Sequence, residues 1–186
     1  QKAVRARDVA DFEKMYRIIN NDPQNEILWV PAAAVKKIQK ARYAEMVLHE
    51  MWCVANLRIK SVEIQGDSAA VRFHHPESRI QFEHPWPRPM VTKDGHNSAF
   101  YLTNAMELLD EPGEWYHDIE SRKIYYYPRK GEKISKAVVP GIETLVWVEG
   151  TIDRPVKHIR FDNVTFQYTT WMRPSLQGHV PLQAGM

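Results

Sequence analysis

The sequence contains little cysteine, no long apolar run and no excess of charge of one sign. Its single cysteine, Cys53, excludes a disulfide bond within the chain and a zinc site built from cysteine ligands. No run approaches the roughly 18 apolar residues that a membrane-spanning helix needs, so we expect no membrane span. The 25 Lys and Arg residues nearly balance the 23 Asp and Glu residues, for a formal net charge of +2. This balance argues against a nucleic-acid partner.

Motifs for several common chemistries are missing as well. The sequence has no Gly-rich phosphate-binding motif, no Gly-x-Ser-x-Gly and no His-x-His or His-Glu-x-x-His spacing. Of the 8 histidines, His74 and His75 are adjacent and would point to opposite sides of a strand. We therefore expect no metal site and no cofactor. Cys53 follows Met51-Trp52 in a strand-like run, which is typical of a buried structural thiol.

The composition is that of a folded protein. Apolar residues make up 44% and charged residues 26% of the 186 residues, and aromatic residues are plentiful, with 6 Trp, 8 Tyr and 6 Phe. The length predicts one domain, or one domain plus a fragment. Because the sequence begins at Gln1 without a signal segment and ends in the apolar stretch 182–186, we expect a piece of a longer protein.

The first 40 residues predict mixed secondary structure. A helix is expected over residues 8–20, because four apolar residues have the spacing of one helix face: Phe12, Met15, Tyr16 and Ile19. Residues 27–30 predict a short strand. Pro31 suits the first turn of a second helix, with helix formers over residues 32–39.

From Ala44 onward the pattern predicts antiparallel strands joined by short turns. Strands are expected at 45–52, 56–64, 70–74 and 100–102, with a turn at 66–68 and a helical turn at 104–109. The Pro-rich segment His84–Pro89 predicts a rigid extended connector. Residues 114–118 and 123–127 predict a hairpin whose loop is 119–122.

The pattern changes again after Lys133. Short strands are expected at 145–148, 156–161 and 164–168, separated by polar bends. In the last of these, Val164, Phe166 and Tyr168 would face one way, and Thr165 and Gln167 the other. Repeated strands and bends with apolar residues inward are typical of a parallel β-helix coil. Such solenoids need about three repeats to close a core, and there is room here for one coil, or two.

The segment Leu108–Pro128, with the hairpin arms Glu114–Asp118 and Lys123–Tyr127, resembles a motif of bacterial right-handed parallel β-helix proteins. The run Asp153–Phe166 is similar to the coil that follows it there. The group that these segments resemble is glycoside hydrolase family 141. In that family a mostly β insertion domain interrupts the early coils of the helix.

The resemblance implies a mainly β fold in two parts. Residues 1–130 correspond to the inserted antiparallel β domain with short helices, and residues 131–186 to the first coil or coils of a truncated right-handed parallel β-helix. It further implies a glycosidase-like hydrolase, periplasmic or extracellular, with a polysaccharide or oligosaccharide as substrate. The family's catalytic carboxylates lie on later coils, beyond Met186, so we expect this piece to be inactive alone. One departure is Arg122, where the family's hairpin loop usually has Gly; a positive φ there would cost on the order of 1 kcal/mol.

The expected distances between the carboxylates of the hairpin region do not suit a catalytic pair. Asp110 and Glu111 lie in a turn with Pro and Gly, where acidic residues commonly bond the backbone. Glu114 and Asp118 would be about 13 Å apart at roughly 3.3 Å per residue. Glycoside hydrolysis needs two carboxyl groups about 5–9.5 Å apart.

Exposed aromatic rings are the remaining candidates for a carbohydrate site, because the apolar faces of sugars stack on flat rings. Trp86 lies in the Pro-rich connector, and core packing is the alternative for each ring. If the parent protein is an enzyme, we expect three residues near strand ends at the edge of its cleft: Trp171, His179 and Gln183.

Two other functions stay open. The chain could belong to a non-catalytic carbohydrate-binding or interaction module, or to a polysaccharide lyase, since β-helices host that chemistry too. The sequence lacks an Asp cluster that would hold calcium, which disfavours lyase chemistry within this piece.

Overall fold

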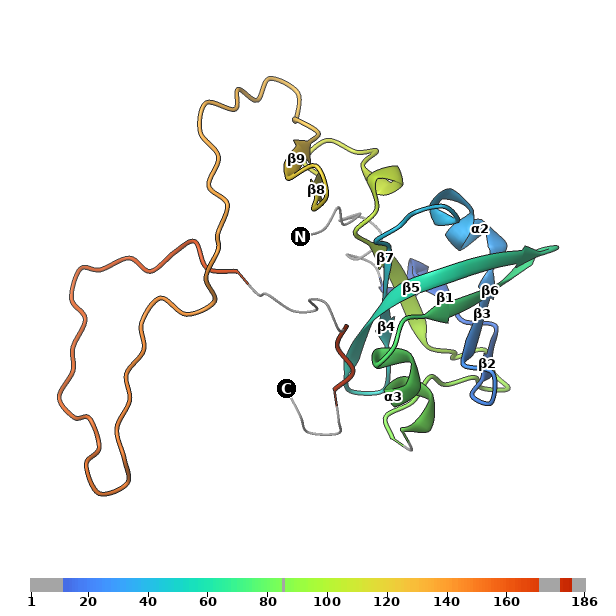
Figure 1. Cartoon of the computed structure of the whole chain (residues 1–186), viewed down its shortest axis with the longest axis horizontal. Helices are drawn as coiled ribbons and strands as arrows, with labels where there is room; N and C mark the ends of the chain where they lie inside the picture. Colours follow the sequence, from blue (N-terminus) through green and yellow to red (C-terminus); the bar gives the residue numbers. More distant parts are fainter. Residues whose placement is uncertain (1–11, 85, 171–177, 182–186) are drawn as a thin grey trace. The chain divides into compact units, whose positions relative to one another are not determined.

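The computed structural model describes residues 12–84, 86–170 and 178–181 (Figure 1). The chain divides into two compact units. The first consists of Gln1–Lys133 together with Pro174–Met186, and the second is Ile134–Arg173. None of the helices in the described part of the chain is both long and apolar enough to cross a bilayer.

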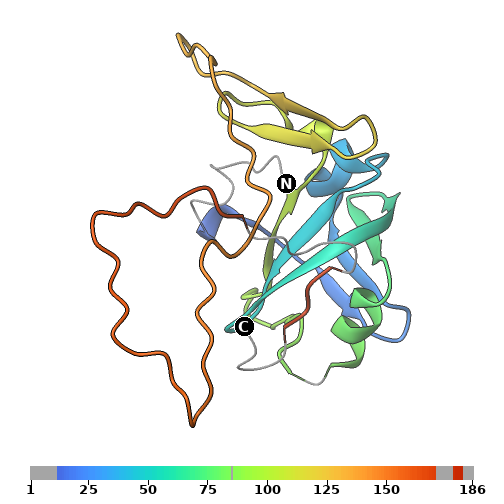
Figure 2. The same ribbon diagram turned by 60° about the vertical axis from the view of Figure 1, so that its left-hand side comes forward.

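The first unit is built on a seven-stranded sheet in which every neighbouring pair is antiparallel (Figure 1). In spatial order the strands are β1 (Tyr16–Arg17), β7 (Ala99–Thr103), β4 (Glu45–His49), β5 (Val54–Gln65), β6 (Ser68–Phe73), β3 (Ile27–Pro31) and β2 (Asn20–Asp22). A second sheet is the hairpin β8 (Trp115–Asp118) and β9 (Lys123–Tyr126), which Figure 2 shows in yellow. The prediction of a mainly β, antiparallel fold is therefore confirmed.

The helices are short. Two α-helices are present in the described residues of this unit, α2 (Ala32–Val35) and α3 (Glu77–Glu83). Three 3₁₀ helices accompany them: η1 (Phe12–Lys14), η2 (Lys36–Ile38) and η3 (Met106–Leu108). Pro31 precedes α2, as expected from its fixed φ and missing N–H donor. The sequence analysis did not predict α3.

Strand β5 connects the two halves of the large sheet. Its first half, Val54–Arg58, pairs with β4, and its second half, from Ile59 to Gln65, pairs with β6 across an irregularity between Ile59 and Ser61. A bulge of this kind bends a strand. The change of partner leaves the first half of β5 with an edge that β6 does not cover.

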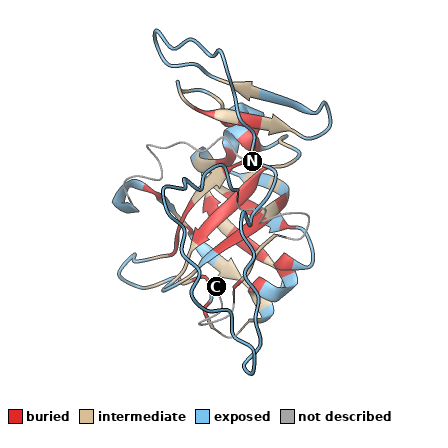
Figure 3. Cartoon of the chain, turned by 90° about the vertical axis from the view of Figure 1, so that its left-hand side faces the viewer, coloured by how far each residue is buried: buried red, intermediate tan, exposed pale blue. Residues whose placement is uncertain are grey.

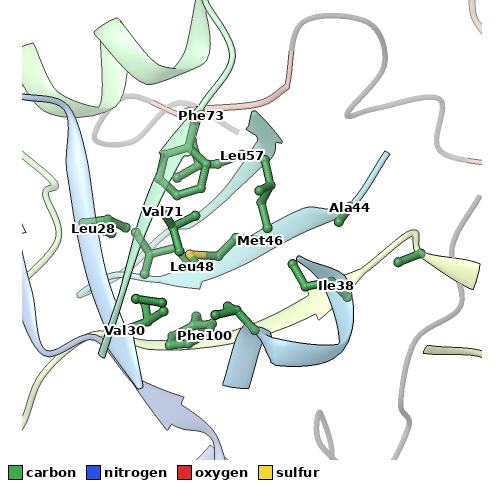
Figure 4. Close-up of a cluster of buried hydrophobic side chains, with 14 of the residues drawn as sticks. Leu28, Val30, Ile38, Ala44, Met46, Leu48, Leu57, Val71, Phe73 and Phe100 are labelled. Carbon is green, nitrogen blue, oxygen red and sulfur yellow. The ribbon is translucent and has the colours of Figure 1, made fainter. Parts of the chain in front are cut away.

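The core of this unit lies against the sheet, and its buried residues are drawn red in Figure 3. The largest of its fully buried apolar side chains come from seven of the strands and helices and from the segment after β1, and Figure 4 shows most of them: Ile18, Leu28, Val30, Val35, Ile38, Met46, Leu48, Leu57, Val71 and Phe100. Each buried side chain of this size contributes about 1.5–3 kcal/mol by leaving water. These strands were expected from apolar runs, and the core explains why they form.

The helix expected over residues 8–20 is wrong where the structure describes it. Only Phe12–Lys14 is helical, as a single 3₁₀ turn, and β1 and β2 follow. The Ile18 N–H donates to the Ser98 carbonyl at 3.0 Å and the Ile19 N–H donates to the Trp29 carbonyl at 2.6 Å. The sheet therefore takes the backbone donors that a helix would have used, and tertiary pairing overrides the helical spacing.

The predicted hairpin is confirmed, with β8 and β9 antiparallel and the loop at 119–122. Arg122 has a φ of +54°, so the turn does require the left-handed conformation that glycine adopts freely. A non-glycine residue there costs on the order of 1 kcal/mol. Asp118 supports the turn, because its carboxylate accepts the N–H of Glu120 at 3.0 Å and the hydroxyl of Ser121 at 2.7 Å.

The second unit differs sharply from the first. Its described residues, 134–170, contain bends but no strand or helix, and nearly all of them are exposed (Figure 3). The strands expected at 145–148, 156–161 and 164–168 do not form. A β-helix strand is hydrogen-bonded to the coils on either side of it, and no second coil pairs with these residues in the described chain. The parallel β-helix stays a prediction.

Candidate functional site

Helix α3 turns polar side chains toward the protein. Glu77, Ser78 and Gln81 are at most 1% exposed, whereas Ile80 on the same helix is 41% exposed. This is the reverse of an ordinary surface helix, in which the apolar face is buried. Buried polar groups need hydrogen-bond partners, so the partners of these side chains fix the position of α3.

The partner of Glu77 is Arg58, at the end of the first half of β5. The Arg58 guanidinium donates from Nε to Glu77 Oε1 at 2.6 Å and from Nη2 to Glu77 Oε2 at 2.9 Å, in a bidentate geometry. The hydrogen bond to Glu77 is the main reason why the pKa of Arg58 is raised. Both carboxylate oxygens of Glu77 are thus held by Arg58, which gives this buried acid a structural role.

The uncovered edge of β5 receives the segment 178–181. The Asn56 N–H donates to the His179 carbonyl at 2.7 Å, and the His179 N–H donates to the Asn56 carbonyl at 2.9 Å. Gly178 has a φ of +64°, and a Cβ there would lie 2.8 Å from the Glu77 side chain and 2.9 Å from the Asn56 carbonyl oxygen. Glycine is therefore needed for the close approach of this segment to Glu77 and β5.

Of the three residues predicted at the cleft edge, His179 lies among the described residues, and its backbone places it beside β5. Trp171 and Gln183 lie outside the described residues. The predicted cleft edge formed by these three residues therefore stays a prediction.

A second polar cluster lies at the tip of the β4–β5 hairpin, residues 50–53. The Glu50 N–H donates to the Cys53 carbonyl at 3.0 Å and closes the turn. The carboxylate of Glu50 accepts a hydrogen bond from Gln81 Nε2 at 2.7 Å and one from Cys53 Sγ at 3.1 Å. Burial raises the pKa of Glu50, although both hydrogen bonds and nearby His84 partly oppose this shift.

Cys53 is half-buried, and burial together with the Glu50 carboxylate raises the pKa of its thiol to about 12. The thiolate is the nucleophilic form of cysteine, so a thiol held protonated is a poor nucleophile. This agrees with the structural role expected for Cys53.

Two tryptophan rings meet beside this cluster. Trp52, in the hairpin tip, is 57% exposed, and its ring lies edge-on to that of half-buried Trp86 in the Pro-rich connector, with 5.4 Å between the ring centroids and 68° between the planes. The Nδ1 atom of His84 lies 3.3 Å from the Pro87 carbonyl oxygen, across the connector. We call Trp52 and Trp86 with Glu50 the hairpin-tip site.

Among its residues, the sequence analysis had singled out Trp86 alone. Trp52 and Glu50 were assigned to a strand over residues 45–52, but β4 ends at His49. Met51 and Trp52 fell inside that predicted strand, and their exposure, which marks the hairpin tip, is known only from the structure.

The carboxylates near the hairpin have local roles. Glu114 Oε2 accepts the N–H groups of Asp110 at 3.0 Å and Glu111 at 2.9 Å. The hydrogen bond from Ser121 is the main reason why the pKa of Asp118 is lowered. Within residues 12–84, 86–170 and 178–181, no group of three His, Cys, Asp or Glu residues could hold a metal ion.

The fold defines the class of the protein: a mainly β, antiparallel domain, followed by residues 134–170, which contain no strand or helix. The family whose model matches residues 1–129 is described as "GH141 insertion domain". Because this match covers more than half of the chain, the chain belongs to the GH141 insertion domain family.

A solved structure supports the same relationship. It is named "Glycoside hydrolase", is 71% identical, and superimposes with a TM-score of 0.89. The match covers 99% of this chain and 32% of that one, so the chain spans about a third of the length of its solved relative. No match was found among curated proteins.

Removal of the buried acid of α3 tests its structural role. We expect Glu77→Ala to lower the free energy of unfolding by about 3 kcal/mol, because Arg58 loses a bidentate partner in a largely buried pair. The matched control is Glu83→Ala on the same helix, whose pair with Arg79 is about two-thirds exposed and contributes less than about 0.5 kcal/mol. Urea denaturation measures both; equal losses would contradict the assignment.

Alkylation tests the contact between Cys53 and Glu50. With a pKa of about 12, the Cys53 thiolate at pH 8 is about a thousandfold scarcer than that of an ordinary cysteine, and greater intrinsic nucleophilicity offsets only part of this. We expect iodoacetamide to react at least tenfold more slowly than with a peptide thiol, and Glu50→Gln to speed the reaction. Mass spectrometry follows it, with exposed Glu63→Gln as control. A rate equal to that of the peptide would show that the thiol is not protected.

Proposed function

We propose that this chain is part of a glycosidase-like hydrolase that acts on a polysaccharide or oligosaccharide. The observation that carries the proposal is the 71% identity, over 99% of the chain, to the protein named "Glycoside hydrolase". Membership of the GH141 insertion domain family supports the same activity class. The chain supplies scaffold and one wall of the substrate cleft, and the catalytic acids lie elsewhere in the longer protein.

The hydrogen bonds of three buried or turn carboxylates support the proposal that the catalytic acids lie elsewhere in the longer protein. Glycoside hydrolysis needs one carboxyl group as acid and a second as base or nucleophile. Glu77 is held by Arg58, Glu114 by the backbone of its own turn, and Asp118 by the hairpin loop. Each of these carboxylates already serves the fold.

We also propose that residues 131–186 form the first coil or coils of a right-handed parallel β-helix in the longer protein. The support is the run of exposed apolar residues, which is unusual for a finished surface. These include Val146, Trp147, Val148, Val156, Ile159, Phe161, Val164, Phe166 and Tyr168. Adjacent coils would bury the inward-facing members of this set and pair the strands.

The proposed location is the periplasm or the exterior of the cell. Polymeric carbohydrate is too large to enter a cell unaided, so an enzyme that acts on it meets its substrate outside. The resemblance to bacterial β-helix proteins is the support for this location.

Activity measurements on two lengths of protein test the proposed function. We expect the 186-residue chain to release no product from a panel of aryl glycosides and plant polysaccharides, and a longer protein that contains it to hydrolyse at least one. Reducing-sugar release measures hydrolysis. Turnover by the chain alone would place the acids within it. Unsaturated products from the longer protein would indicate a lyase, and binding without turnover a non-catalytic module.

A matched pair of substitutions tests the β-helix. In the longer protein we expect Phe166→Asp, on the face predicted to point inward, to lower stability by several kcal/mol, because it buries an unpaired charge. Gln167→Asp, on the opposite face, should change stability by less than about 0.5 kcal/mol. Thermal unfolding measures both. The β-helix arrangement is wrong if the two variants melt alike.

A further inference from the structure

We propose that the hairpin-tip site, defined by Trp52, Trp86 and Glu50, is a binding subsite for a neutral saccharide. The inference rests on the proposed function for its ligand class, a carbohydrate. It adds a location, about which the family match and the solved relative say nothing. Three observations carry it: an exposed aromatic face, a rigid mount and a nearby hydrogen-bonded carboxylate.

The aromatic face comes from Trp52. The flat apolar face of an exposed tryptophan ring can stack against the apolar face of a sugar. Trp52 is 57% exposed, and the ring of Trp86 stands at 68° to it. Two rings at this angle form a corner, in which one sugar ring can stack on Trp52 while Trp86 bounds it from the side.

The rigid mount comes from the polar contacts beneath the tip. The hydrogen bond between Glu50 and Cys53 closes the turn, and Gln81, which is fully buried on α3, holds the Glu50 carboxylate at 2.7 Å. The tip therefore does not have to be ordered when a ligand binds. A preorganised ring loses little conformational entropy on binding, which favours a weak ligand such as a sugar.

The carboxylate of Glu50 defines the kind of sugar. Its two oxygens each accept one hydrogen bond from the protein, and a carboxylate has about four acceptor positions, so it retains capacity for sugar hydroxyl donors. A second negative charge beside it would be repelled. The site therefore suits neutral sugars and disfavours uronic acids.

Binding measurements on the full chain test this subsite. The probes are oligosaccharides of glucose, xylose, mannose and galactose, with oligogalacturonate as the acidic member, titrated by calorimetry. We expect at least one neutral probe to bind and the acidic one not to. Trp52→Ala should raise the dissociation constant about tenfold or more, and Trp52→Phe, which keeps a flat ring, should raise it less.

The matched control is Trp147→Ala, which removes a tryptophan that is 76% exposed in the second unit. It should leave the dissociation constant unchanged, and circular dichroism checks that each variant is folded. No binding of any neutral probe, a preference for oligogalacturonate, or equal losses in Trp52→Ala and Trp147→Ala would overturn the subsite. Hydrolysis by the longer protein without such binding would refute the subsite alone, and binding through Trp52 without hydrolysis would refute the proposed activity alone.

Discussion

The buried polar face of α3 is the constraint on which the arrangement of the first unit depends. Its three buried side chains bond to three separate parts of the first unit: Glu77 to Arg58 on β5, Ser78 to Glu26 at 2.5 Å, and Gln81 to Glu50 at the hairpin tip. An apolar helix face can slide with small loss, but a set of directional hydrogen bonds is satisfied in one position only. The polar face therefore specifies where α3 lies, at the expense of hydrophobic stabilisation.

The position of α3 affects two places in the first unit, namely the edge of β5 where residues 178–181 join it and the hairpin-tip site. Glu77 lies against Gly178, so the same side chain that pairs with Arg58 shapes the place where 178–181 joins β5. One helical turn further on, Gln81 holds Glu50 and thereby the tip that carries Trp52. A substitution that shifts α3 would therefore disturb both the edge of β5 and the hairpin tip that carries Trp52.

Much of the fold was predictable because strands with buried apolar residues and polar turns leave a local pattern. Strand β3 and the hairpin β8–β9 were predicted from such patterns, whereas the pattern left open whether Arg122 takes a positive φ. Helix α3 was not, because its buried face is polar and hydrophobic periodicity carries no signal for it. The hairpin-tip site was only partly foreseen, since the contact of Trp52 with Trp86 joins segments more than thirty residues apart.

The two units also differ in how their folding is determined. In the first, strands distant in sequence close a core with each other, and residues such as Leu57 and Phe100 are fully buried by the unit's own side chains. An inserted domain needs this property, because its core must not depend on the host fold. In residues 134–170 the apolar pattern is present but its partners are not, and the residues stay exposed. An apolar pattern thus indicates which side of a strand is buried, but a strand forms only where another segment completes its hydrogen bonds.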